Sequence, residues 1–152
     1  MAADEGRPDY DPPQRMRRLP SWLASELARR GQALVGDALA QEGARRQHFA
    51  VLTSLVEQGG ASQADLGRRL WIDRSDLHAL LGEMERDGLV ARVRDAGDRR
   101  RNVVTLTPAG EAALARLDER VDSAQRALLK PLSAKERREL IRLLERVVAE
   151  RS

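Results

Sequence analysis

Two short segments with clear helix starts, joined by a turn of about three residues, constrain this chain most. Segment 62–70 begins with serine and carries aspartate three positions later, a capping pair typical of a helix N-terminus. Segment 73–88 begins with Asp73 and ends with Gly88, residue types that favour the start and the end of a helix. The sequence therefore predicts a helix-turn-helix.

The second of these helices is amphipathic. Its apolar residues recur every three or four positions and share one face: Leu77, Leu80, Leu81 and Met84. Its opposite face is polar and short: Arg74, Ser75, His78 and Gly82. Such a helix suits the DNA major groove, with its N-terminal side chains toward the bases, although an ordinary surface helix has the same pattern.

The periodicity changes after Gly88. Apolar and polar residues alternate over 89–94 and again over 102–107, which predicts two strands. The connecting residues 95–101 are rich in turn formers and arginine. Residues 91–102 contain five arginines and two aspartates, so their net charge is +3. We therefore expect a basic β-hairpin, the wing of a winged helix-turn-helix.

Longer helices flank this module. We expect helices from Ser21 to about Gln41, over Ala44–Gln58, from the Thr107-Pro108 start to about Leu129, and from the Ser133 capping pair onward. Their apolar stripes are wide for so small a chain, and a second copy of the chain is the simplest cover. A homodimer would place two recognition helices about one DNA turn apart on a palindromic site.

The predicted fold class is mainly α with a small β-hairpin, a winged helix-turn-helix whose flanking helices form a dimerisation region. Residues 1–19 are rich in proline and charge and predict a flexible tail. Residues 20–152 form the domain. Within it, 20–43 and 109–152 supply the dimerisation helices, and 44–108 form the winged helix-turn-helix.

The composition argues against several classes of function. The chain has no cysteine and two isolated histidines, and it lacks a glycine-rich phosphate loop and a paired-carboxylate motif. We therefore expect no catalysis, no metal and no cofactor. Because no apolar run reaches membrane length and no signal-peptide pattern is present, we expect a cytoplasmic protein, associated with the nucleoid when bound to DNA.

Residues 46–110 resemble the multiple-antibiotic-resistance regulator (MarR) family. The matching stretches are RQHFAVLTSL, SQADLGRRL, IDRSDLHALLGEMERDGLV and DRRRNVVTLTPAG. The resemblance implies a homodimeric transcription factor, usually a repressor, which releases double-stranded DNA when a small aromatic or phenolic ligand binds. Two features depart from the family: Trp71 stands where many members have glycine, and the cysteine of the oxidant-sensing branch is absent.

The resemblance implies DNA-contacting roles on the helices. The positions that match base-contacting residues are Arg74, Ser75, Asp76 and His78. Asp76 has a competing role, because it lies three residues after Asp73 and could complete that helix cap. On the preceding helix, Ser62 serves as the cap and the candidate phosphate contacts are Gln63, Arg68 and Arg69. A solvated face remains an alternative for the two arginines.

The resemblance also implies roles in the wing. Arg100 matches the arginine that the family inserts into the minor groove, where narrow A·T-rich segments attract cations. We expect Asp98 to support the wing by pairing with a neighbouring arginine. Arg99 and Arg101 are expected to face phosphate or solvent.

A ligand site between the dimerisation and DNA-binding regions is also implied. The candidate lining residues are Trp22, Arg46, His48, Phe49 and Leu52, among which Arg46 could neutralise a carboxylate. Each of them also fits core packing or an ordinary surface position. Two other functions remain open: a winged-helix protein-interaction module, and a DNA-binding protein that responds to no ligand.

Overall fold

The computed structural model describes residues 11–150, which form seven helices and one hairpin. In chain order these elements are α1 (Gln14–Arg17), α2 (Pro20–Ala40), α3 (Arg46–Gln58), α4 (Gln63–Leu70), α5 (Arg74–Arg86), β1 (Val90–Arg94), β2 (Asn102–Leu106), α6 (Pro108–Leu128) and α7 (Ala134–Ala149). The two strands pair antiparallel, with Val90 opposite Leu106 and Arg94 opposite Asn102. The prediction of a mainly helical fold with one small hairpin is confirmed.

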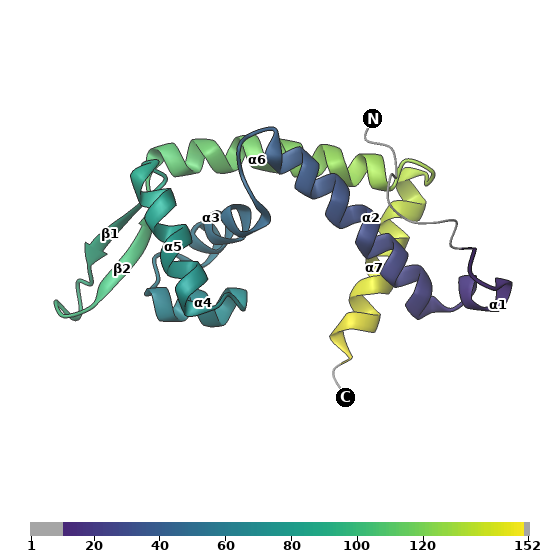
Figure 1. The fold of residues 1–152 in the computed structure, drawn as a ribbon, viewed down its shortest axis with the longest axis horizontal. Helices are drawn as coiled ribbons and strands as arrows, with labels where there is room; N and C mark the ends of the chain where they lie inside the picture. The colour runs from purple at the N-terminus through teal and green to yellow at the C-terminus, as the bar shows by residue number, and fades with distance from the viewer. Residues whose placement is uncertain (1–10, 151–152) are drawn as a thin grey trace.

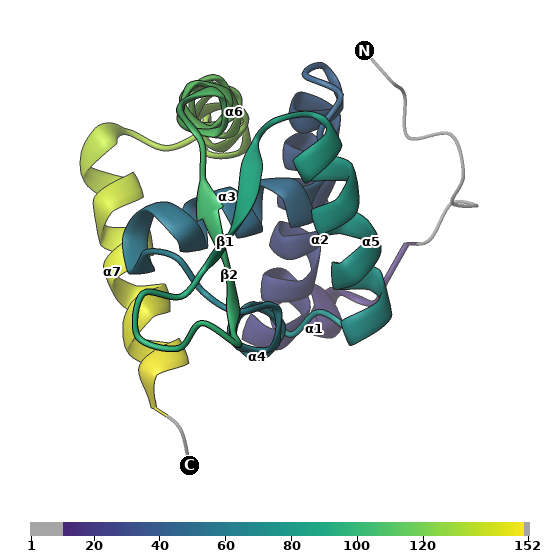
Figure 2. The ribbon, with the colours of Figure 1, turned by 90° about the vertical axis from the view of Figure 1, so that its left-hand side faces the viewer.

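Helix α6 runs along most of the length of the molecule (Figure 1). Helices α3, α4, α5 and the hairpin lie under one end of it, and α2 and α7 lie under the other end. Figure 2, a view along α6, shows the hairpin descending from that helix toward α4. The winged module and the outer helices are therefore two halves joined by one long helix.

The core of the winged module is aliphatic. The apolar stripe predicted for α5 is buried as expected, with Leu77 and Leu81 fully covered. Leu52 of α3 and Leu66 of α4 pack in the same cluster, which Val90 and Val104 extend into the hairpin. Helix α5 is thus held from behind by α3, α4 and the hairpin, and its polar face stays outside.

Gly110 fixes the junction between the hairpin and α6. A Cβ atom at this position would lie 2.1 Å from the carbonyl oxygen of Leu89, so only glycine fits. The Thr107 backbone N–H donates to the same oxygen, and its side chain caps α6 by accepting from the Gly110 N–H. The residues Thr107 to Gly110 therefore set the angle at which the wing leaves the long helix.

The outer helices leave apolar residues uncovered. No residue of α7 is buried, and Val147 and Val148 are 74% and 75% exposed. Leu19 and Leu23, at the start of α2, are also exposed. Since stable proteins seldom leave a contiguous apolar surface open to water, these helices have the character of an interface.

Some boundaries differ from those predicted. Helix α2 begins at Pro20 after Leu19, so Ser21 is inside the helix and does not cap it. Helix α3 begins at Arg46, two residues later than expected. Of the predicted tail 1–19, residues 1–10 lie outside the described residues, while Gln14–Arg17 form one helical turn.

Candidate DNA interface

The turn between α4 and α5 depends on a close backbone approach. The Ile72 N–H donates to the Gly67 carbonyl at 3.2 Å, and a Cβ on Gly67 would lie 3.3 Å from the Ile72 oxygen. Trp71 ends α4 in the left-handed conformation, with φ 54° and ψ 40°. The turn therefore keeps the helix-turn-helix geometry with tryptophan in place of glycine.

Asp73 caps α5, as predicted. Its carboxylate accepts from the backbone N–H of Ser75 at 2.8 Å and from the Ser75 hydroxyl at 2.5 Å. The hydroxyl bond and then the N–H bond hold the pKa of Asp73 below its usual value. Because the Ser75 hydroxyl proton is engaged, the Ser75 oxygen is free only to accept a further hydrogen bond.

Gln63 connects the two helices on their outer side. Its amide nitrogen donates to the Arg74 carbonyl at 3.3 Å, and its amide oxygen lies 3.5 Å from His78 Nδ1. The phosphate contact of Gln63 stays a prediction; in the structure its amide contacts Arg74 and lies near the His78 ring. Both residues face the same open groove.

This groove between α4 and α5 has a volume of about 1100 Å³. It is lined by Gln63, Ala64, Gly67, Arg68, Ile72, Asp73, Arg74, Ser75 and His78. Most candidate residues of the two helices are therefore brought together on one surface. Asp76 and Arg69 are exposed but lie outside the groove lining.

The cap of α4 differs in detail from the predicted reciprocal pair. The Ser62 oxygen accepts from the Asp65 N–H, as expected. The Asp65 carboxylate does not return to the Ser62 N–H and instead accepts from the Ser62 hydroxyl at 2.6 Å. This arrangement leaves the carboxylate of Asp65 pointing outward, toward cations.

Two arginines reach Asp65. Arg68 of the same helix and Arg101 of the wing both form ion pairs with its carboxylate, and Arg101 also donates to Ser62 Oγ at 3.0 Å. The Ser62 hydrogen bond, followed by Arg101 and Arg68, lowers the pKa of Asp65. The Arg101 side chain is exposed, as predicted, and it also fastens the wing to α4, which was not predicted. The ion pair between Arg101 and Asp65 could not be predicted from the sequence, because 36 residues separate the two partners.

The wing tip is shaped by its aspartates. Asp98 accepts from the Arg100 backbone N–H at 2.9 Å, so it supports the tip through the main chain and not through the expected arginine side chain. Asp95 accepts in the same way from the Gly97 N–H. The side chains of Arg99 and Arg100 are exposed at this tip. Figures 1 and 2 both show the tip reaching the same side of the molecule as α4.

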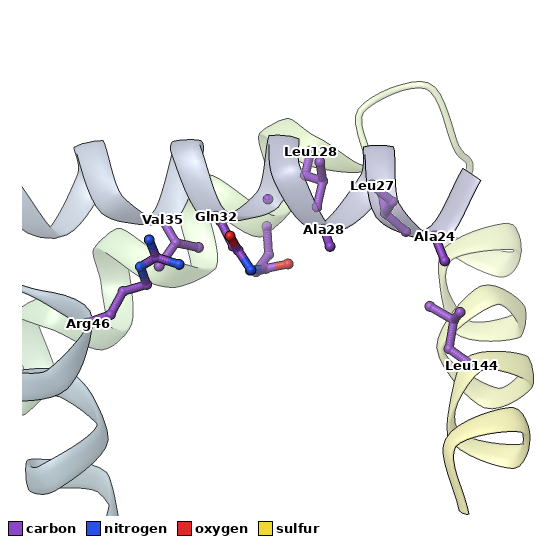
Figure 3. A pocket seen from close by; sticks show the side chains of 10 residues that line it. Ala24, Leu27, Ala28, Gln32, Val35, Arg46, Leu128 and Leu144 are labelled. Atoms are coloured by element: carbon purple, nitrogen blue, oxygen red, sulfur yellow. The ribbon is translucent and has the colours of Figure 1, made fainter. Parts of the chain in front are cut away.

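A second cavity, of about 450 Å³, lies among α2, α6 and α7 (Figure 3). Its lining is apolar apart from Gln32, Arg46 and Gln125. Figure 3 shows Arg46 pointing toward Val35 and Gln32, while Leu144 faces Ala24 at the far end. The cavity therefore combines an apolar wall with one cationic end.

The other candidate ligand residues are not gathered there. His48 and Leu52 line a separate cavity of about 170 Å³ beside α6, and Trp22 and Phe49 belong to neither lining. His48 is 8% exposed and caps α3, because its Nδ1 accepts from the Arg45 N–H at 3.0 Å. Burial, followed by the nearby Arg45 charge, lowers the pKa of His48. Helix capping and packing account for His48.

The described range 11–150 contains no cluster of three histidine, cysteine or acidic side chains that could hold a metal ion. Nor does any helix within it have the length and apolarity needed to span a membrane.

Comparison with known proteins places these features in context. A family model described as the MarR family matches residues 43–101. The homoprotocatechuate degradative operon repressor of Escherichia coli is 32% identical over 103 residues, covering 68% of this chain and 70% of that protein. The transcriptional activatory protein BadR of Rhodopseudomonas palustris is 45% identical over 76 residues, covering 48% of this chain and 43% of that protein. The structure of the PcaV transcriptional regulator from Streptomyces coelicolor with its natural ligand has a TM-score of 0.67 and 31% identity, covering 89% and 95% of the two chains.

Proposed function

This chain belongs to the MarR family of transcriptional regulators, and on that premise we propose that it is a repressor that binds a palindromic operator as a homodimer. In this role the α4–α5 groove enters the major groove of double-stranded DNA, and the wing lies along the neighbouring minor groove. The protein acts in the cytoplasm, on the nucleoid, and has no enzymatic activity.

One observation carries this proposal: the α4–α5 groove and the wing present arginines on the same side of the molecule. Arg74 and His78 line the groove, and Arg100 lies at the wing tip. Arginine can bind guanine through two hydrogen bonds, and a cation at the wing tip suits the negative potential of a narrow minor groove. The Ser75 oxygen adds an acceptor for an adenine or cytosine amino group.

The uncovered helices support the homodimer. The exposed apolar residues of α7 and of the start of α2 need a partner, and two-fold symmetry pairs each such surface with its own copy. In such a dimer the distance between the two recognition helices depends on how the outer helices pack. DNA affinity can therefore be controlled from the dimerisation region.

We infer that the cavity among α2, α6 and α7 binds a small aromatic or phenolic carboxylate. The apolar wall suits a ring, and Arg46 at one end suits the carboxylate. Relatives support this ligand class, since one is named for a homoprotocatechuate degradative operon, and homoprotocatechuate is a phenolic acid. In a dimer with two arrangements, one has its α5 helices at the spacing of the DNA groove and the other does not. The ligand would release DNA only if it binds the second arrangement more tightly than the first.

Two other functions remain as alternatives. A winged-helix module that binds protein would use the α4–α5 groove to bind a peptide. The exposed arginines of this groove instead favour a polyanion. A DNA-binding protein without an effector would leave the Arg46 cavity unused. Both alternatives are tested by the experiment below.

Selection of bound duplexes from a genomic DNA pool tests the proposal directly. We expect one enriched palindromic sequence, which would also identify the regulated gene. No enrichment over random duplexes would contradict sequence-specific binding and favour the protein-interaction module. An effector found in a panel of phenolic acids should raise the melting temperature of the protein and dissociate it from the selected duplex. No response across the panel would favour a binder without effector.

A further inference from the structure

Trp71 lies at the turn of the helix-turn-helix and is 95% exposed. Its backbone has the one positive φ found at a non-glycine residue within 11–150. A side chain in the left-handed conformation destabilises the backbone, whereas glycine adopts it without strain. Because the indole is almost fully exposed, packing does not compensate for this strain.

Arginines flank Trp71 in the sequence. Trp71 follows Arg68 and Arg69 in the last turn of α4 and precedes Arg74 at the start of α5. The residues that follow it, Ile72 and Asp73, line the α4–α5 groove, so the backbone of Trp71 lies next to that groove. Among residues 11–150, neither Arg69 nor Arg74 forms an ion pair. A polyanion that enters the groove would therefore pass beside Trp71.

We propose that Trp71 is a DNA contact that packs against the sugar–phosphate backbone at the rim of the major groove. This inference rests on the proposed function, and it adds a contact that the family glycine could not make. The indole has an apolar face that suits the deoxyribose ring and one N–H that can donate to a phosphate oxygen. Tryptophan is also among the residues that contribute most to binding when an exposed side chain becomes covered.

A backbone contact of this kind has a distinctive signature. It does not read bases, so it strengthens binding to the operator and to unrelated duplexes alike. It is uncharged, so it releases no counterion and leaves the salt dependence of binding unchanged. An arginine contact to phosphate, in contrast, contributes about 0.9 to the slope of log affinity against log salt.

The first test replaces Trp71 by glycine and by phenylalanine. Trp71→Gly should weaken DNA binding by about tenfold, with an unchanged salt slope and an unchanged operator preference. Its melting temperature should stay near that of the wild type, because relieved strain offsets the added flexibility of the unfolded chain. Trp71→Phe keeps a ring and should recover part of the affinity. Wild-type affinity in both variants would overturn the proposal.

The second test uses fluorescence, because Trp22 is the other tryptophan of the chain. In the Trp22→Phe variant, acrylamide should quench Trp71 strongly in the free protein and much less after addition of duplex. The matched Trp71→Phe variant, which reports Trp22 alone, should change little. If acrylamide quenches the Trp71 fluorescence equally with and without bound duplex, the proposed contact is wrong. Failure of labelled duplex to bind the wild type at low salt would instead contradict the proposed function.

Discussion

The guanidinium of Arg101, in the tip loop of the wing, pairs with the carboxylate of Asp65 near the start of α4. Arg101 also donates to the cap residue Ser62 at 3.0 Å. Ala61 exchanges two backbone hydrogen bonds with Val104 of β2 nearby, so side chains and main chain join the wing to α4. The two parts of the proposed DNA surface are therefore held in one relative orientation.

Removing this contact should affect DNA binding more than stability. In Arg101→Ala we expect faster amide exchange at the wing tip and several-fold weaker operator binding, with a small change in melting temperature, since exposed ion pairs contribute little to folding. Asp65→Asn should have the same effect, and the double variant should be no worse than either single one. Arg99→Ala is the control, because it removes a tip charge without touching Asp65. Additive effects of Arg101→Ala and Asp65→Asn would contradict a shared role.

Arg100 is expected to be the main DNA contact of the wing. Arg100→Ala should reduce operator affinity by roughly 5- to 150-fold, the effect of losing about 1–3 kcal/mol of a specific arginine contact. The dimer and its melting temperature should not change, because the side chain is exposed. Arg126→Ala, near the distant end of α6, is the matched control. Fluorescence anisotropy of labelled duplex measures both, and wild-type affinity in Arg100→Ala would remove the wing from the mechanism.

His48 should make stability depend on pH. Burial lowers its pKa below the ordinary 6.5, so the folded protein binds a proton less readily than the unfolded chain. Its stabilising contribution is therefore complete above pH 6.5 and decreases as the pH falls toward the lowered pKa. Thermal melts between pH 7.5 and 5 should show this loss in the wild type and in His78→Ala, but a smaller loss in His48→Asn. An NMR titration that gives His48 a pKa at or above 6.5 would contradict the claim that burial lowers this pKa.

The uncovered face of α7 should hold the dimer together. Val147→Glu places a charge on this face and should convert a particle of twice 17.0 kDa into one of 17.0 kDa in sedimentation equilibrium. Operator binding should weaken strongly, because one monomer reaches one half-site. Lys135→Glu, on the polar side of the same helix, should leave the dimer intact. A Val147→Glu protein that remains dimeric would assign dimerisation to other surfaces.

Local signals in the sequence predicted most of the fold. Ser62, Asp73, Thr107 and Ser133 cap the helices that follow them, because a cap depends on neighbours within a few residues. The apolar period of α5 likewise predicted its buried face. The single turn Gln14–Arg17 was missed, since four residues are too few to show a helical period.

The site was predicted less completely, because its details depend on long-range contacts. The sequence placed Arg74 and His78 on the correct face, but it could not show that Gln63 bridges to both. Arg101 was assigned to phosphate or solvent since its partner Asp65 is distant in the chain. The sequence predicts the ligand residues from the helices that carry them. In the structure Arg46 lines one cavity and His48 and Leu52 line another, while Trp22 and Phe49 line neither, because residues on one helix face different neighbours.

The central claim is that the α4–α5 groove and the wing bind duplex DNA by sequence. The most direct measurement is the affinity of the wild-type protein for the selected duplex and for a scrambled one, from about 50 to 200 mM salt. We predict a linear fall of log affinity with log salt for both duplexes, and a preference for the selected one that Arg74→Ala abolishes. A flat salt dependence, or equal affinity for the two duplexes, would contradict the claim.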